Sequence, residues 1–300
     1  SVVEAAGALG QIDRFGNIPE QGSTDKGDEA MTQGDDEVRL VRNGHILEIT
    51  INRPKVNAID AATSRKLGEA FVVLRDDPEL RVGIITATGK KVFCAGWDLK
   101  ALDSGDQALD NWWEGEDADL GGFAGITEMW NLNKPVIAAL NGLTIGGGFE
   151  IALASDLIIA ADNVQFALPE MPLGIVPDAG ALQRLPRRLP HNIALEMLFL
   201  GRWMPADEAK MHGLVNAVVP HDQLMDKARE WATRLADSAP LALQTVKEVL
   251  RAVEGDTIQN AFQTMRTSDL PIYRKMLNSE DAKEGVNAFV EKRKPVFKGK

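Results

Sequence analysis

The chain has 300 residues, of which 44% are hydrophobic and 26% charged, so it is long enough for one or two domains with a large buried core. Its formal net charge of −11 argues against a general nucleic-acid binder and against docking on an anionic membrane surface. A single cysteine, Cys94, excludes an intramolecular disulfide and any metal cluster held by cysteines.

No apolar run approaches the roughly 20 residues of a membrane span, and no signal peptide is recognisable at the N-terminus. We therefore expect a soluble protein of the cytoplasm that binds neither nucleic acid nor membrane. The first 36 residues are expected to form a low-complexity extension, because the stretch Gln11–Asp36 is rich in Gly, Asp and Gln and has too few apolar residues to build a core.

Residues 37–225 are predicted to form an α/β core that contains the active site. A hairpin is predicted around Arg42-Asn43-Gly44, and Asp60 is placed to cap a helix whose apolar residues recur at helical spacing. The succession of strand, turn, helix and strand then repeats, which is typical of a mostly parallel sheet. The predicted strands and helix are Arg81–Thr88, Lys91–Cys94, Pro135–Leu140, a helix from about Gly148 to Ser155, and Asp156–Ala160.

Beyond Leu185 the pattern is helical, and we assign residues 226–300 to a helical C-terminal region with a role in oligomerisation. Within it, Thr257–Met276 is expected to form one helix and Ser279–Lys292 another, with Ser279 as a possible cap.

The segment Asn141–Glu150, NGLTIGGGFE, carries the clearest chemical signal. A strand ends, three glycines follow and a helix begins, so a ligand can approach the backbone closely and meet the amide groups of a helix start. The fingerprints of dinucleotide and phosphate loops do not fit. The turn is therefore either an oxyanion site or a tight β–α turn without a ligand.

Taken singly, the polar residues near this turn have ordinary explanations. Glu150 could complement the helix dipole, Glu170 could be an exposed turn residue, and Asp98 in Phe93–Lys100 could follow a plain β–α turn. No cluster of histidine and cysteine argues for a metal site, and Cys94 is expected in the core.

In combination these segments form a pattern that is specific to one protein family. The sequence contains, in order, Asn57-Ala58, AGWDLK, KPVIAALNGLTIGGGFE, ALPEMPLGIVPDAGALQRLP and the terminal AFVEKRKPVFK. From about Glu37 to Lys300 the chain resembles the crotonase superfamily, the enoyl-CoA hydratase/isomerase family. The resemblance implies a spiral of repeated ββα units followed by a helical C-terminal region. A narrower resemblance, to the carnitinyl-CoA dehydratase group, is carried by NAIDAATS, RDDPELRV, AGWDLKA, GGFAGITE, QFALPE, LGIVPDAG and SEDAKEG.

The resemblance implies roles for four residues. The backbone amides of Trp97 and Gly147 would form an oxyanion hole for the thioester oxygen, and Glu150 and Glu170 would hold the water as acid and base. Which glutamate is the acid stays open. The implied reaction is the reversible hydration of an enoyl-CoA, with carnitinyl-CoA and crotonobetainyl-CoA as the narrow candidates.

The resemblance also implies an acyl-CoA substrate, no cofactor beyond its CoA moiety, and a homotrimer or homohexamer. Phe289 and Lys292 match residues that reach a neighbour's site in family trimers, although each could simply be a packing or solvated residue. The implied CoA contacts in each chain's own site are Lys55, Val56, Ala58, Ala95, Asp98 and Leu99.

Asp178 departs from plain hydratases, many of which have glycine at this position. It is a third proton-transfer group, a charge at the acyl end, or an N-cap for a helix Ala179–Leu185. Trp112-Trp113, among acidic residues, could bind a quaternary ammonium group, but we favour a solvated acidic segment there. Two other functions stay open: an enoyl-CoA isomerase in which Glu170 or Asp178 moves a proton, and an acyl-CoA-binding protein with little catalysis.

Overall fold

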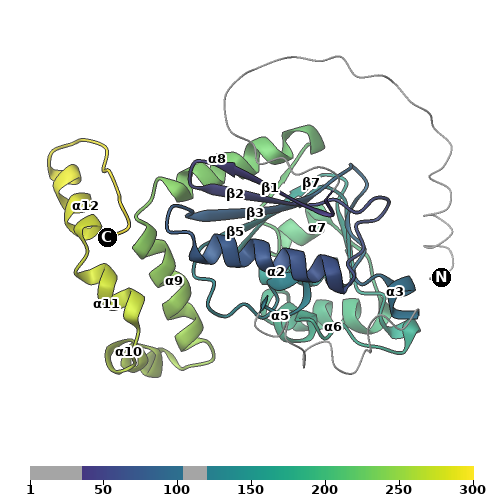
Figure 1. The fold of residues 1–300 in the computed structure, drawn as a ribbon. Coiled ribbons are helices and arrows are strands. Elements are labelled where there is room, and N and C mark those ends of the chain that lie inside the picture. Colours follow the sequence, from purple (N-terminus) through teal and green to yellow (C-terminus); the bar gives the residue numbers. More distant parts are fainter. Residues whose placement is uncertain (1–35, 104–119) are drawn as a thin grey trace, which may run out of the picture.

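The computed structural model describes residues 36–103 and 120–300 (Figure 1). The proposed N-terminal extension, apart from Asp36, and the segment with Trp112 and Trp113 lie outside the described residues.

The main sheet starts with the predicted hairpin, in which β1 (Val38–Asn43) pairs antiparallel with β2 (Ile46–Ile51). The remaining strands are parallel, in the order β1-β2-β3-β5-β7-β10. Every residue of β3 and β5 is buried, as expected for parallel strands that are covered on both faces. The bounds of these parallel strands are β3 (Val82–Ala87), β5 (Val136–Leu140), β7 (Leu157–Ala161) and β10 (Ala217–Val219).

A second, smaller sheet has the order β4-β6-β8-β9. After each of β3, β5 and β7 in the main sheet, the chain makes a short strand of the small sheet, namely β4, β6 and β8. The path therefore winds between the two sheets as a spiral, which confirms the expected fold class. The bounds are β4 (Val92–Cys94), β6 (Leu143–Ile145), β8 (Gln165–Ala167) and β9 (Met204–Pro205).

Helices surround these sheets. The amphipathic α8 (Leu224–Ala236) packs across β3, β5 and β7, while α4 (Gly147–Ala154) is buried almost throughout (Figure 1). The other helices of this part are α2 (Ala61–Asp76), α3 (Leu99–Asp103), α5 (Ala181–Arg188), α6 (His191–Leu200) and α7 (Ala206–Met211), with the 3₁₀ turns η3 (Phe123–Gly125), η4 (Met171–Leu173) and η5 (His221–Gln223).

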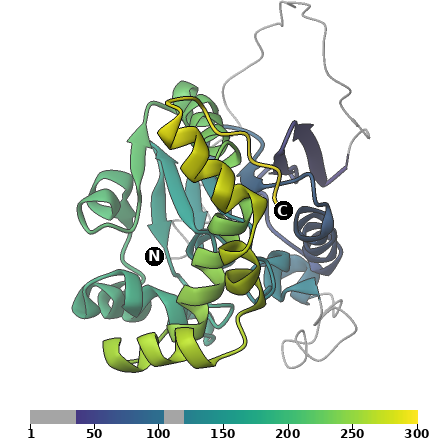
Figure 2. The same ribbon diagram turned by 90° about the vertical axis from the view of Figure 1, so that its left-hand side faces the viewer.

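The C-terminal helices form an arm that projects from this body (Figures 1 and 2). The expected single helix Thr257–Met276 is wrong: it is divided into α10 and α11, because Pro271 has no N–H group and disfavours helical geometry in the residue before it. Ser279 caps the last helix as predicted, with its side chain accepting the Ala282 N–H. The arm consists of α9 (Pro240–Val253), α10 (Ile258–Thr267), α11 (Pro271–Leu277) and α12 (Glu280–Val290).

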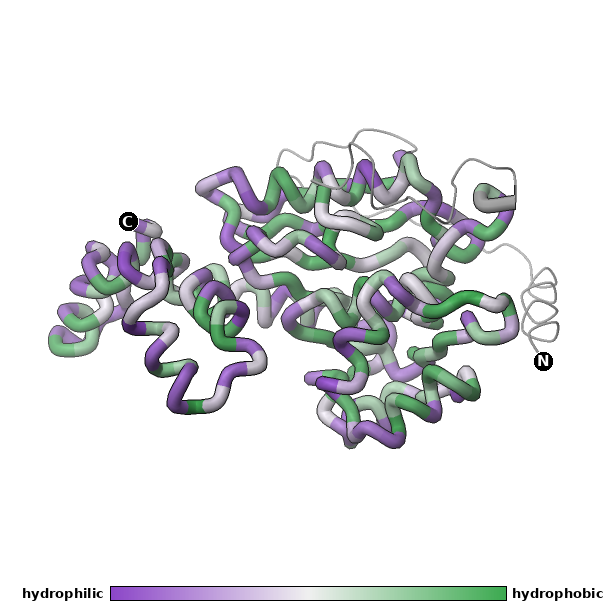
Figure 3. The backbone as a smooth tube through the Cα atoms, turned by 90° about the horizontal axis from the view of Figure 1, so that it is seen from below, coloured by the Kyte–Doolittle hydropathy of each residue, from purple (hydrophilic) through white to green (hydrophobic). Residues whose placement is uncertain are grey.

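The chain end ties the arm back to the body. Arg81, just before β3, donates to the carbonyl oxygens of Ala236 at 2.8 Å and Phe297 at 2.9 Å. The Asp281 carboxylate, in the first turn of α12, accepts the backbone N–H groups of Lys298 and Gly299, each at 2.7 Å. Hydrophilic and hydrophobic residues are interspersed along the arm (Figure 3), and α9, α10 and α12 are amphipathic.

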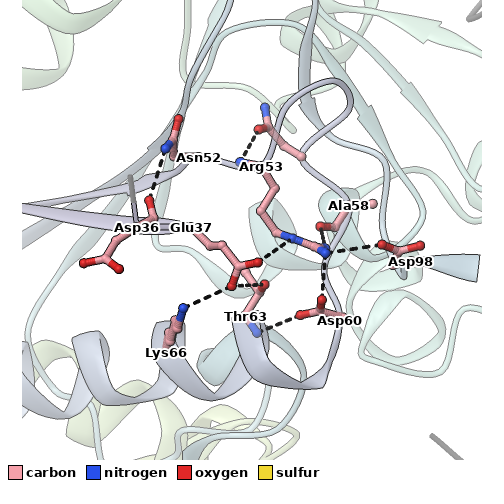
Figure 4. A network of polar contacts seen from close by, with 10 residues as sticks. Asp36, Glu37, Asn52, Arg53, Ala58, Asp60, Thr63, Lys66 and Asp98 are labelled. Carbon is pink, nitrogen blue, oxygen red and sulfur yellow. Dashed lines mark hydrogen bonds and ion pairs between the residues drawn. The ribbon is translucent and has the colours of Figure 1, made fainter. Parts of the chain in front are cut away.

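The start of α2 is stabilised by a charged cap. Asp60 Oδ1 accepts the Thr63 N–H at 2.8 Å, and Asp60 Oδ2 pairs with Arg53 at 2.7 Å (Figure 4). One carboxylate thus satisfies an amide at the helix start and also anchors the loop that precedes the helix.

We predict that Asp60→Ala lowers the free energy of unfolding by about 1–2 kcal/mol, because it removes this cap and a partner of Arg53. Urea denaturation measures the change. Glu69→Ala, at an exposed position of the same helix, is the control and should stay within about 0.5 kcal/mol of the parent. Equal losses of unfolding free energy in the two variants would contradict the assignment of Asp60 as a stabilising cap.

Candidate active site

The glycine-rich turn after β6 places the start of α4. Gly146 has a φ of 53°, and its carbonyl accepts the N–H groups of Phe149 and Glu150, which begins the helix at Gly147. The amides of a first helical turn have no acceptor within the helix, and the helix dipole adds positive potential there. This turn therefore presents N–H groups that suit a developing negative charge.

The turn after β4 lies directly against this helix start. Gly96 has a φ of 87°, and a Cβ atom on it would lie 2.8 Å from the Gly147 nitrogen. Only glycine permits this backbone contact. The Cys94 thiol, buried as expected, accepts the Gly96 N–H at 3.3 Å. Trp97 and Gly147, the two residues predicted to supply the oxyanion hole, therefore lie in adjacent turns.

Glu150 points into the protein from the first turn of α4 and is only 3% exposed. Its Oε1 accepts the N–H of Ala181 at 3.0 Å, and Ala181 is the first residue of α5. The carboxylate of one helix thus satisfies an amide at the start of another, which restrains its orientation.

The start of α5 corrects one prediction for Asp178, that it is the N-cap of this helix. The helix begins at Ala181 rather than at Ala179, and its N-cap is Gly180, which offers no side chain. Asp178 lies two residues too early and is exposed, so it is not the cap. The Arg184 guanidinium fills the space beside Gly180 where a Cβ would be, which explains why no side chain stands at the cap.

Glu170 lies at the end of the loop after β8 and is 9% exposed. Its Oε1 would be 2.8 Å from a Cβ atom at Gly146, so the carboxylate occupies space that a side chain there would take. Its Oε2 is buried and has no hydrogen-bond partner among the described residues. Glu170 and the turn before Glu150 are thus in contact, although the two glutamates are twenty positions apart in the sequence.

Both glutamates bind their protons more tightly than ordinary carboxyl groups. Burial, reinforced by the negative charges of Glu170 and Asp178, raises the pKa of Glu150 to about 8, although the Ala181 N–H opposes this. Burial and the charge of Asp178 raise the pKa of Glu170 to about 7. Between about pH 7 and pH 8, the two pKa values, the pair therefore holds about one proton, so one carboxyl can donate while the other accepts.

The two segments predicted to bind CoA lie side by side. Ile59 and Trp97 form a parallel β-bridge, and the Ala95 N–H donates to the Val56 carbonyl at 3.1 Å. Arg53 joins the segments from the other side, through the Ala58 carbonyl and Asp98, whose Oδ2 is 3.4 Å away (Figure 4). The residues brought to this edge are Lys55, Val56, Ala58, Ala95, Asp98 and Leu99, of which Lys55 and Leu99 are exposed.

Phe289 and Lys292 do not join this group within the chain. Phe289 is in α12 with 84% of its surface exposed, and Lys292 follows that helix. The helix α12 lies at the opposite end of the molecule from α3, which follows the CoA segments (Figure 1). Any contribution of these two residues to a site of this kind would have to come from a neighbouring chain.

Two positioning contacts were missed by the sequence reasoning. The sequence gives no local signal for the Ala181 amide that holds Glu150, since the contact joins two helices. The role of Gly146 in making room for Glu170 could have been suspected from the three consecutive glycines, but the partner could not. Within residues 36–103 and 120–300, no group of three or more His, Cys, Asp and Glu side chains is arranged to hold a metal ion.

Comparison with known proteins agrees with this geometry. The family model described as enoyl-CoA hydratase/isomerase matches residues 41–300. The carnitinyl-CoA dehydratases of Proteus mirabilis (strain HI4320) and Shigella flexneri are each 54% identical over 265 residues, which covers 88% of this chain and 98% of each relative. The chain therefore belongs to the enoyl-CoA hydratase/isomerase family.

Solved structures extend this likeness to the fold. The crystal structure of enoyl-CoA hydratase from Mycobacterium tuberculosis H37Rv is 39% identical with a TM-score of 0.79, and the match covers 88% of this chain and 99% of that one. An enoyl-CoA hydratase from Bacillus anthracis is 32% identical with a TM-score of 0.77, covering 88% and 100%. The expected crotonase-type enzyme is confirmed. Among the helices of the described residues, none has the length and apolar character needed to cross a membrane.

We predict that Glu150→Gln makes the protein more stable at alkaline pH. The folded-state pKa of about 8 exceeds the ordinary value of 4.5, so the folded state binds the extra proton between these values, and stability falls as the pH rises through this range. Gln does not ionise, so the variant avoids this loss of folding stability, which amounts to a few kcal/mol at pH 8.

Melting curves at pH 5 and pH 8.5 test this expectation. The melting temperature of Glu150→Gln should exceed that of the parent at pH 8.5 and nearly equal it at pH 5. Glu69→Gln, at an exposed position, should show no such change. A difference that is the same at both pH values would refute the link to ionisation of Glu150.

Proposed function

We propose that this protein catalyses the reversible addition of water to the double bond of an enoyl-CoA thioester. The observation that supports this most strongly is the pair of buried carboxyl groups, Glu150 and Glu170, whose pKa values are raised to about 8 and about 7 beside the glycine-rich helix start. Hydration needs a base that takes a proton from water and an acid that protonates Cα. A carboxyl pair that carries one proton can supply both groups at once.

We propose that the backbone amides of Trp97 and Gly147 bind the thioester oxygen. When water adds to the conjugated double bond, negative charge develops on this oxygen as an enolate forms. Donors fixed at a helix start are oriented before the reaction, so they stabilise the enolate without reorganisation, and in a dry site this is worth several kcal/mol. The close contact of Gly96 with Gly147 supports the proposal because it brings the two turns together.

We propose carnitinyl-CoA and crotonobetainyl-CoA as the substrate pair. The relatives at 54% identity bear the name carnitinyl-CoA dehydratase. Such an acyl group carries a fixed positive charge, which would be costly to remove from water without compensation. Asp178 supports this substrate, because its charge acts on both Glu150 and Glu170 and so lies near the reacting end of the site. The reaction as proposed needs no metal and no cofactor beyond the CoA moiety of the substrate.

A second candidate is an enoyl-CoA isomerase, which would move a proton along the acyl chain without adding water. The proximity of Asp178 to the two glutamates favours it, because a third carboxylate could carry that proton. Two buried carboxyl groups with raised pKa values argue against a mere acyl-CoA-binding role. We propose the cytoplasm as the site of the reaction.

We predict that Glu150→Gln and Glu170→Gln each lower kcat by about 10²–10⁴-fold, because general acid–base groups contribute rates of this size. The loss of the 2-enoyl thioester absorbance, with crotonyl-CoA and crotonobetainyl-CoA side by side, measures the rate. Binding of the CoA ester should change little, and Glu69→Gln should behave as the parent. Near-normal hydration by either active-site variant would show that its assigned role is wrong.

We predict that Asp178→Asn and Asp178→Ala lower kcat/KM for crotonobetainyl-CoA at least tenfold more than for uncharged crotonyl-CoA. The physical reason is that Asp178 compensates the fixed positive charge of the acyl group. The kinetics of both substrates with both variants measure this selectivity. Equal losses on the two substrates would instead make Asp178 an acid–base group and would remove the reason for a cationic acyl group.

We propose that the arm forms part of a trimer or a dimer of trimers, in which Phe289 and Lys292 reach a neighbour's site. Large apolar side chains are exposed on its helices, and water disfavours such a surface. The exposed side chains of α10 and α12 are Ile258 (81%), Phe262 (56%), Val286 (65%), Phe289 (84%) and Val290 (72%).

We predict a mass of three or six chains by light scattering. Phe289→Ser should shift the population toward smaller species, because it removes an apolar contact between chains. Lys283→Ser, at an exposed polar position of the same helix, is the matched control. A fully active monomer would contradict both the assembly and the contribution of Phe289 and Lys292 to a neighbour's site.

A further inference from the structure

A cavity of about 540 Å³ lies at the end of α4 that is farthest from the glycine-rich turn. Ala154, the last residue of α4, lines it, whereas Gly147 at the other end belongs to the active site. At a rise of 1.5 Å per residue these two positions are ~10 Å apart along the helix. Neither Glu150 nor Glu170 lines the cavity, although Arg184 in its wall acts electrostatically on Glu150. The walls come from α5, α9 and the segment before β5.

The lining of this cavity is positively charged, in a protein whose formal net charge is −11. Arg184 and Arg188 reach it from α5, and Lys247 and Arg251 reach it from α9, whereas only two carboxylates line it. One of these, Asp156, is occupied by Lys247, with Nζ 2.7 Å from Oδ2. Three guanidinium groups are thus left to face the other carboxylate.

That other carboxylate, Glu254, forms an ion pair with Arg187, which does not line the cavity. The distance from Glu254 Oε1 to the Arg187 guanidinium is 3.8 Å. In the described part of the chain, none of the three guanidinium groups that line the cavity has a carboxylate oxygen within 4 Å. They donate instead to neutral acceptors. Arg184 donates to the Thr127 carbonyl at 2.5 Å, Arg188 to the Ser155 carbonyl at 3.2 Å, and Arg251 to the Trp130 carbonyl and the Asn133 side chain.

Placing like charges together in a partly buried space is unfavourable unless an anion compensates them. Burial, and then the neighbouring charge of Arg188, lower the pKa of Arg184, although the charges of Glu150, Glu128 and Glu254 partly oppose this. The remaining walls include the apolar side chains of Ile126, Met129 and Leu250, and an apolar wall strengthens electrostatic attraction inside the cavity. Guanidinium groups present paired N–H donors that match the oxygen atoms of phosphate and carboxylate groups.

We propose that this cavity binds a small dianionic oxyanion, of the phosphate or dicarboxylate class, through Arg184, Arg188 and Arg251. A double negative charge matches the excess of two positive charges in the lining. The proposal does not rest on the proposed hydratase reaction, because none of the three arginines belongs to the proposed acid–base pair, oxyanion hole or CoA contacts.

Isothermal titration of the full chain with inorganic phosphate and, in a separate arm, with succinate tests the proposal. Both are added at pH 7.5 with the ionic strength held constant by NaCl. We expect one site per chain for at least one of the two anions, and the tighter of them identifies the ligand class. Arg188→Gln and Arg251→Gln should each weaken binding at least about tenfold, since a hydrogen bond to a charged group is lost.

Lys210→Gln, at an exposed position of α7, is the control, because it removes one positive charge that lines no part of the cavity, and it should bind as the parent does. Circular dichroism verifies the fold of each variant, and if one fails to fold the other decides the question. Three results would overturn the proposal: binding of neither anion, as expected if a neighbouring copy fills the cavity; equal weakening by Lys210→Gln; or binding unaffected in both cavity variants.

Discussion

The architecture of the site depends on one close backbone contact, between Gly96 in the turn after β4 and the Gly147 nitrogen at the start of α4. A Cβ atom at Gly96 would come within 2.8 Å of that nitrogen, so the contact requires glycine. It brings two turns together that belong to successive windings of the spiral. The proposed oxyanion hole of the Trp97 and Gly147 amides depends on this contact, because it holds the two turns side by side.

The same compact packing has an electrostatic cost. Two carboxyl groups are buried within reach of each other's charge, and their pKa values rise to about 8 and about 7. A protein selected only for stability would avoid this arrangement, because each proton lost with rising pH destabilises the fold. The arrangement is understandable if the shared proton takes part in the reaction, since perturbed pKa values gather at functional sites.

Much of this could be read from the sequence, for identifiable reasons. The hairpin at β1 and β2, the capped start of α2 and the buried strands β3 and β5 follow from alternation, capping residues and apolar runs, all of which are local signals. Local patterns did not separate α10 from α11, although Pro271 marks the boundary. The short strands β6, β9 and β10 were missed because three residues or fewer carry little periodicity, whereas the equally short β4 was marked by the Ala-Gly turn that follows it.

For the site, the sequence by itself determined which residues are available: the glycines of the two turns, Glu150, Glu170 and the motifs that mark the family. Only the tertiary structure decided how they are used. It placed Glu150 against the Ala181 amide and gave the N-cap of α5 to Gly180 instead of Asp178. It also put α12, which contains Phe289, at the end of the molecule opposite α3. The physical reason is that motifs encode backbone conformation over a few residues, whereas burial, pKa and hydrogen-bond partners depend on groups that approach only when distant segments pack together.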